Sequence, residues 1–172
     1  GVDASGLELR CLAHYMNDPQ YTNIVEKGDV HTANQHAAGL QTRDQAKTFI
    51  YAFLYGAGAA KIGKVVGGTA KHGQQLITRF LNNIPALKHL RMLVSTAAAN
   101  DTIKALDGRL LHIRSEHAAL NTLLQGAGAI VCKQWLVHIM ERVIKAKLDA
   151  RLVASIHDEY QFEVAIPDIE RF

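Results

Sequence analysis

Cysteine is scarce in this chain: only Cys11 and Cys132 occur among 172 residues, and they form no CxxC pair. The two lie far apart in the sequence and among apolar neighbours. Cysteines in such positions are typical of buried free thiols rather than of a disulfide framework. We therefore expect a protein of a reducing compartment.

Long apolar runs are also missing. No stretch approaches the roughly 20 residues that a helix needs to cross a bilayer, and the first residues do not resemble a signal peptide. Internal repeats and low-complexity tracts are absent as well. The sequence predicts a soluble, cytoplasmic protein with no membrane partner.

Neither sign of charge is in large excess. The sequence holds 19 Lys and Arg against 16 Asp and Glu, which gives a net charge of +3 with nine neutral histidines. A weakly basic net charge is compatible with nucleic-acid binding but does not demonstrate it, because binding depends on how the positive charges cluster on the surface. The hydrophobic content of 48% suffices for one domain, or for one domain with a large insertion. Because the chain begins at Gly1 without a methionine and stops within IPDIERF, we interpret it as a piece of a larger protein.

Helical patterns dominate the first hundred residues. Apolar spacing predicts a helix over Leu7–Met16, with Ser5 as its N-cap and Glu8 as the capping-box partner, after an extended segment Gly1–Asp3. Pro19 then interrupts the pattern. Further helices are predicted over residues 31–38, 42–56, 70–82 and 85–100, with Asp29 and Thr42 as caps of the first two and Gly39 and Gly56 at their ends.

Two hairpins and one long helix are predicted in the remainder. The pair Asp107-Gly108 separates two short apolar runs, which indicates a hairpin. A long amphipathic pattern over residues 116–147 predicts the main core helix. Alternating segments on both sides of the HDE sequence at residues 157–159 indicate a second hairpin. The chain therefore combines helices and antiparallel strands.

One row of side chains stands out on the predicted helix Thr42–Gly56. Arg43, Lys47, Tyr51 and Tyr55 recur at every fourth position and therefore share one slanted face. Taken singly, each is better explained as a solvated charge or as amphipathic packing. Together, two cations lie at the end where the helix dipole favours phosphate, and two phenols follow. This order suits a nucleoside triphosphate, and Lys47 is placed to give a proton or positive charge to departing pyrophosphate.

Carboxylates occur near both ends of the chain. His157, Asp158 and Glu159 form the apex of the predicted terminal hairpin, and acidic turns are usually only structural. Asp3, however, ends an extended segment at the other terminus. If that segment lies beside the hairpin, Asp3 and Asp158 could converge on hard divalent cations. Two ions about 3.5–4 Å apart would stabilise the attacking and leaving oxygens of a phosphoryl transfer.

Three segments, in order, resemble motifs A, B and C of the family-A DNA polymerases: DASGLELR (Asp3 to Arg10), RDQAKTFIYAFLYGAG (Arg43 to Gly58) and HDE (His157 to Glu159). They are most similar to the replicative polymerases of short-tailed coliphages and their marine relatives. HAALNTLLQGAGA (His117 to Ala129) resembles the minor-groove tract of the family. The resemblance covers nearly the whole chain. It implies template-directed DNA synthesis from dNTPs on a primer-template in the cytoplasm of a phage host.

The resemblance also implies an architecture. It predicts an α+β polymerase palm, a small antiparallel sheet with a long packing helix, and an inserted helical fingers subdomain. Residues 1–16 and 101–172 would form the palm and residues 17–100 the fingers, with motif B at 42–58. The exonuclease domain, thumb and first palm strands of the family have no counterpart in this sequence. The stretch from Asn100 to Leu106 is shorter than in the coliphage enzymes, and any processivity factor would bind the missing thumb.

Roles for single residues at the reaction centre follow from the same resemblance. Asp3 and Asp158 would hold two Mg²⁺ ions together with the carbonyl of Ala4, and Glu159 would be an adjacent carboxylate of lesser importance.

The resemblance implies dNTP contacts for five residues. Glu8 would be the steric gate against a ribose 2′-hydroxyl, His31, Arg43 and Lys47 would contact the triphosphate, and Tyr51 would face the sugar. A tyrosine at the sugar-facing position is associated in the family with tolerance of dideoxynucleotides.

DNA contacts are implied for six residues. Tyr55 would stack at the templating base, and Gly56 would permit close approach there. The other four are His117, Asn121 and Gln125 at the minor groove, and His157 near the primer end. Bacterial members carry Arg in place of His117, so this sequence departs from them there.

Local explanations compete with several of these roles. Glu8 considered alone is better explained as the acid of the capping box, and His31 as a surface histidine. Gly126 and Gly128 each cost roughly 1 kcal/mol inside a helix, and close packing explains them as well as DNA contact does.

Two other functions are also compatible with parts of the sequence. A non-catalytic DNA-binding or nucleotide-binding fragment would need no thumb. A two-metal nuclease or phosphatase would need the carboxylates but has no use for the row from Arg43 to Tyr55.

Overall fold

A computed structural model describes all 172 residues, which form an α+β fold that is mostly helical with two small antiparallel sheets. The helices are α1 (Leu7–Met16), α2 (Pro19–Lys27), α3 (Val30–Ala38), α4 (Arg43–Leu54), α5 (Ala59–Val65), α6 (Ala70–Asn83), α7 (Pro85–Ala98) and α8 (Ala119–Ala146), with 3₁₀ turns at Glu116–Ala118 and Ile166–Asp168. The strands are β1 (Val2–Asp3), β2 (Thr102–Lys104), β3 (Leu110–His112), β4 (Ala150–Ile156) and β5 (Glu159–Val164). None of the helices combines the length and the apolar character that crossing a membrane requires.

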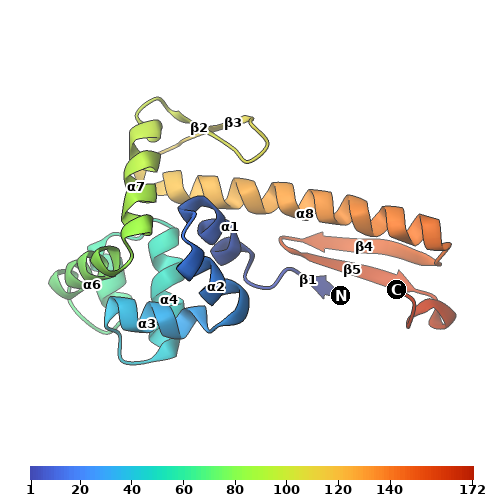
Figure 1. Ribbon diagram of the computed structural model, residues 1–172, viewed down its shortest axis with the longest axis horizontal. Helices are drawn as coiled ribbons and strands as arrows, with labels where there is room; N and C mark the ends of the chain where they lie inside the picture. Colours follow the sequence, from blue (N-terminus) through green and yellow to red (C-terminus); the bar gives the residue numbers. More distant parts are fainter.

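The two ends of the chain meet in one sheet. Its strand order is β1-β5-β4, all antiparallel, so β1 from the N-terminus lies beside the terminal hairpin (Figure 1). Asp3 is opposite Glu159 in this ladder. Just beyond it, the N–H of Ala4 donates to the carbonyl oxygen of Asp158 at 3.0 Å. The backbone therefore places the Asp3 segment beside the terminal hairpin, which is the arrangement that convergence of Asp3 and Asp158 requires.

Between these ends, helices α1 to α7 gather around one core together with the first half of α8 (Figure 1). Phe80 of α6 packs edge-to-face on Phe49 and Phe53 of α4, with ring centroids 5.1 and 5.5 Å apart. Each such pair contributes about 0.5–1.5 kcal/mol beyond the area that it buries. These two rings point inward, while the row of cations and phenols lies on another face of α4, where Arg43, Lys47 and Tyr55 are exposed and Tyr51 is half-buried.

Most of the predicted elements are confirmed near their expected bounds. Thr42 caps α4 through a complete capping box with Gln45, and the side chain of Asp29 caps α3. Gly39 ends α3 in the left-handed conformation, with φ of 74°. The strands β2 and β3 pair as the hairpin around Asp107-Gly108, and β4 and β5 pair around the terminal turn.

The predicted capping box at the start of α1 is wrong. Gly6, not Ser5, is the N-cap, and no side chain caps this helix. Gly6 adopts φ of 62°, so it turns the chain sharply from β1 into α1, a conformation that glycine reaches without strain. Glu8 is thereby left free of the cap. Instead it faces α8, where Nε2 of Gln125 donates to Oε1 of Glu8 at 3.4 Å.

Two further differences concern helices. The sequence predicts an interruption at Pro19, but Pro19 is the first residue of α2, which Asp18 caps by accepting from two backbone N–H groups. Proline suits the first turn of a helix because its missing N–H would have no partner there. In α8, the prediction of a main core helix holds for the first half, while Val137 and Ile144 further along are exposed.

Helices α5 and α6 contact each other through glycine. A Cβ on Gly73 would overlap the carbonyl oxygen of Ala59. We expect Gly73→Ala to lower the free energy of unfolding by about 2–3 kcal/mol, because the backbones of α5 and α6 must move apart to admit the new Cβ. This loss outweighs the higher helix propensity of alanine. Urea denaturation measures this change. Gly58→Ala is the control, since no atom lies within 4 Å of a Cβ there, and equal losses in both variants would contradict the packing argument.

Candidate nucleotide and metal site

A cleft of about 550 Å³ opens between α1, α3 and α4. Its charged and aromatic lining residues are Arg10, Asp29, His31, Arg43, Lys47 and Tyr51, and we call it the cationic cleft. Three of the four residues in the predicted row on α4 therefore line a single concave surface. Cations outnumber the one carboxylate in this lining, so the cleft favours an anion.

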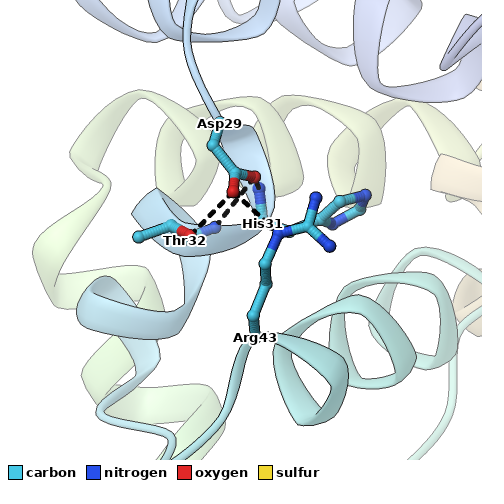
Figure 2. Close-up of polar contacts among 4 residues, drawn as sticks. All are labelled: Asp29, His31, Thr32 and Arg43. Atoms are coloured by element: carbon cyan, nitrogen blue, oxygen red, sulfur yellow. Dashed lines mark hydrogen bonds and ion pairs between the residues drawn. The ribbon is translucent and has the colours of Figure 1, made fainter.

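Asp29 organises one wall of the cationic cleft (Figure 2). Its Oδ1 accepts from the backbone N–H groups of His31 and Thr32 at 3.1 and 3.3 Å, and its Oδ2 accepts from the Thr32 hydroxyl at 2.8 Å. The same Oδ2 pairs with Nε of Arg43 at 2.7 Å. The hydrogen bond from Arg43 is the main reason that the pKa of Asp29 lies well below its ordinary value. Asp29 therefore stays ionised.

His31 lies next to this pair with one ring atom unused. Its Nδ1 is buried and has no hydrogen-bond partner. Burial lowers the pKa of His31, and the neighbouring Arg43 cation lowers it further. Both effects favour the neutral imidazole, and His31 itself lines the cationic cleft.

A second cleft, of about 500 Å³, lies between α1, α4, α8 and the β4-β5 turn. Its polar lining residues are Glu8, Tyr55, Gln125, Cys132, His157 and Asp158, and we call it the carboxylate cleft. Burial and then the Glu8 carboxylate raise the pKa of Tyr55. Tyr55 is 53% exposed, so its ring is available for stacking.

The row on α4 joins the two clefts. Tyr51 lines the cationic cleft and Tyr55 the carboxylate cleft, one helical turn further along. The pKa of Tyr51 is raised first by burial and then by the charges of Glu8 and Asp158, which belong to the second cleft. An elongated molecule lying along α4 would therefore contact cations at one end and approach carboxylates at the other.

The carboxylates offer oxygen ligands from two strands. Asp3 is exposed at the end of β1, and Asp158 lies in the adjacent turn, held by the bond from Ala4. The Glu159 carboxylate accepts from the Gln161 amide, which makes it less free. No group of three or more His, Cys, Asp and Glu residues is arranged to hold a metal ion. Mg²⁺ is usually bound by only one or two carboxylates plus substrate phosphates, so this donor set suits it.

The two cysteines are both buried and free, as predicted. Burial is the main cause that raises the pKa of Cys11 to about 11. It also raises the pKa of Cys132, with a further contribution from the nearby Asp158. Burial therefore favours the thiol over the more reactive thiolate at both positions.

Some of the predicted site residues lie elsewhere. Gly56 and His117 line a third cavity, of about 540 Å³, between α4 to α7 and the start of α8. Gly56 has φ of 78°, and a Cβ there would overlap the carbonyl oxygen of His117. The close approach at Gly56 is therefore made by the chain's own backbone. Asn121 is half-buried near the start of α8 and lines none of the three cavities.

The glycines of α8 have packing partners. A Cβ on Gly126 would crowd the Leu111 side chain of β3, and one on Gly128 would press on Leu7 of α1. Close packing within the chain therefore accounts for both.

Sequence reasoning missed two residues of the cationic cleft. The sequence indicates Asp29 only as the cap of α3 and indicates no role for Arg10. The Nε of Arg10 donates to the Ser5 carbonyl at 3.0 Å beside the cleft. The sequence does contain a signal for Asp29. A helix N-cap two residues before His31 places a carboxylate close to any ligand that His31 contacts. No local pattern points to its partner Arg43, 14 residues further on.

Comparisons with known proteins identify relatives of the chain. Residues 1–172 match the profile of DNA polymerase family A. The chain is 45% identical over 195 residues to a DNA-directed DNA polymerase of Enterobacteria phage T3, a match that covers 99% of this chain and 28% of the relative. It is 46% identical over 185 residues to the DNA-directed DNA polymerase of Escherichia phage T7, covering 94% and 26%. The chain thus spans about a quarter of the length of these relatives.

A solved structure has the same fold. The POL domain of Pol1 from M. smegmatis, in complex with DNA primer-template and dNTP, superposes with a TM-score of 0.87 over 98% of this chain and 34% of that one. The sequence identity is 21%, so this likeness establishes the fold alone.

Proposed function

Because this chain belongs to DNA polymerase family A, we propose that it carries the reaction centre of template-directed DNA synthesis in phage replication, in the cytoplasm of the host. In this reaction a primer 3′-hydroxyl attacks the α-phosphate of a dNTP and pyrophosphate leaves. The observation that carries the proposal is the α4 row, which runs from the cationic cleft into the carboxylate cleft. A nuclease or phosphatase would have no use for this row.

The proposed division of the chain follows its topology. Residues 1–16 and 101–172 would be the palm, since both ends contribute to the β1-β5-β4 sheet. Residues 17–100, whose regular elements are all helices, would be the fingers, with motif B at 42–58.

The cationic cleft would bind the triphosphate. Arg43 and Lys47 supply positive charge in the first turns of α4, where the helix dipole adds to it. His31 lines the same cleft, and its imidazole would form one hydrogen bond to the triphosphate. During the reaction Lys47 would neutralise the charge that develops on pyrophosphate, or give it a proton. Tyr51 and Glu8 would bound the sugar, Glu8 as the steric gate against a 2′-hydroxyl.

Asp3 and Asp158, with the carbonyl of Ala4, would hold two Mg²⁺ ions, and Glu159 would add negative charge nearby. When bound, the ions would supply Lewis-acid stabilisation to the attacking and leaving oxygens. The backbone bond between Ala4 and Asp158 keeps the two carboxylate-bearing segments in register.

The carboxylate cleft would receive the primer-template. Tyr55 would stack at the templating base, Gln125 would read a minor-groove acceptor, and His157 would lie near the primer end. The bond from Gln125 to Glu8 would link minor-groove reading to the sugar gate. We further propose DNA contacts for Asn121, and for Gly56 and His117 at the third cavity. A processivity factor would bind a thumb subdomain of the polymerase.

Primer extension by this 172-residue chain tests the function. We expect Mg²⁺-dependent addition of the complementary dNTP to a primer annealed to a longer template. Binding of DNA and dNTP without any addition would support the alternative of a non-catalytic binding fragment.

Tyr51→Phe tests the sugar-facing role. Tyr51 lines the cationic cleft half-buried, and the family resemblance associates tyrosine at this position with acceptance of dideoxynucleotides. We expect the variant to discriminate against ddNTPs at least about tenfold more strongly, since loss of one hydrogen bond to a bound group is worth about 1.4 kcal/mol. The measurement is the ratio of ddNTP to dNTP incorporation. An unchanged ratio would remove Tyr51 from the sugar site.

A further inference from the structure

The pair Asp29–Arg43 lies in the cationic cleft but contributes little to folding. The two side chains are 45% and 51% exposed, and ion pairs with that exposure typically contribute between 0 and about 1 kcal/mol. Four donors nevertheless converge on the Asp29 carboxylate, from three residues on two helices. These four hydrogen bonds therefore fix the orientation of the Asp29 and Arg43 side chains more than they stabilise the fold.

The contact with Asp29 engages only one edge of the guanidinium. Arg43 donates through Nε, and its two terminal nitrogens have no hydrogen-bond partner in the chain. Figure 2 shows these two nitrogens directed away from the carboxylate and toward the His31 ring. A guanidinium is planar with five donors, so fixing Nε also fixes the directions of the remaining four N–H bonds. Those bonds can form a two-point contact with a phosphate.

Asp29 also ties this orientation to α3. Its Oδ1 accepts from the N–H groups at the start of α3, and its Oδ2 holds Arg43 at the start of α4. His31, which belongs to the same capped turn, is thereby kept beside Arg43. The two side chains that would meet the triphosphate are set by a single carboxylate.

We propose that Asp29 is a positioning residue for the triphosphate, which holds Arg43 by Nε so that the terminal nitrogens face the cationic cleft. The inference rests on the proposed function, because it takes the occupant of that cleft to be a dNTP. Asp29 itself does not contact the substrate. Its negative charge acts through Arg43.

Asp29→Asn separates this role from helix capping. Asparagine caps helices about as well as aspartate, so the variant keeps the acceptor for the α3 N–H groups and loses the charge that holds Arg43. Asp18 provides the matched control. It caps α2 by accepting from Gln20 and Tyr21 and makes no ion pair, so Asp18→Asn removes an N-cap charge without disturbing a cation.

The experiment is calorimetric titration of the 172-residue chain with dATP in the presence of Mg²⁺. We expect Asp29→Asn to raise the Kd about five- to tenfold, the range of a single coupling between neighbouring groups. Asp18→Asn should change it less than about twofold by the same measure. In an Arg43→Gln background, which itself weakens binding, Asp29→Asn should have no further effect. Thermal unfolding of the two Asn variants should differ little, which excludes a folding defect as the cause.

Three results would overturn the role of Asp29 and leave the proposed function intact. Tighter binding by Asp29→Asn would make Asp29 a competitor of phosphate for Arg43. An unchanged Kd would make it only a cap. A loss that persists in the Arg43→Gln background would mean that it acts without Arg43. By contrast, if Arg43→Gln has no effect, or the unaltered chain binds no dATP, the triphosphate assignment itself fails, and the role of Asp29 falls with it.

Discussion

Asp158→Ala should lower primer extension at least about a thousandfold, the scale of losing a group that stabilises charge in a phosphoryl-transfer transition state. The side chain of Asp158 lies in the carboxylate cleft and would be one of two carboxylates that hold Mg²⁺. Its backbone carbonyl, which pairs with Ala4, is retained in the variant, so the sheet should form. Single-turnover extension measures the rate, and fluorescence anisotropy should find DNA binding largely in place.

Glu163→Gln is the control for Asp158→Ala. Glu163 lies on the same hairpin, is exposed and lines neither cleft, so its loss removes a carboxylate of β5 without touching the site. Its extension rate should stay within about twofold, as for surface substitutions generally. Retained extension by Asp158→Ala, or an equal loss in the control, would rule out the metal assignment.

Lys47→Gln should reduce the maximal rate of nucleotide addition about 10²–10³-fold, the magnitude found when a charge-stabilising donor or a general acid is removed. Lys47 lines the cationic cleft one helical turn after Arg43. Because the charge on pyrophosphate grows as the reaction proceeds, the rate should suffer more than the affinity for dNTP. Rapid-quench measurements over a range of dNTP concentrations separate the two quantities.

Lys64→Gln is the matched control for this variant. Lys64 is exposed on α5 and lines neither cleft. Its substitution therefore removes one positive charge at a distance from the site. A weaker affinity with an unchanged maximal rate for Lys47→Gln would mean that Lys47 binds the triphosphate without acting in the chemical step.

Much of the helical structure could be predicted because its signals are local. The capping box of Thr42 and Gln45 and the left-handed Gly39 involve groups within four residues of each other, and they gave helix limits that the structure confirms. The same kind of signal failed at Ser5 and Glu8. There the turn from β1 into α1 is made by Gly6, because the position of β1 depends on pairing with β5 at the other end of the chain.

The candidate site was predictable in its residue types and only partly in its arrangement. Periodicity alone places Arg43, Lys47, Tyr51 and Tyr55 on one face of α4. It does not reveal that this face passes from one cleft into another, since α1, α3 and α8 form the opposite walls.

The sequence by itself determined the helices other than α2 and α5, both hairpins, the row on α4 and the acidic turn between β4 and β5, because each depends on neighbours along the chain. Tertiary structure alone decided the pairing of β1 with β5, the ion pair of Asp29 with Arg43 and the packing of Gly56 on His117. These contacts join residues that many others separate, and closing such loops costs entropy that only the assembled core offsets. The order of the cations and phenols along α4 can therefore be read from the sequence. The two clefts that they line depend on the whole fold.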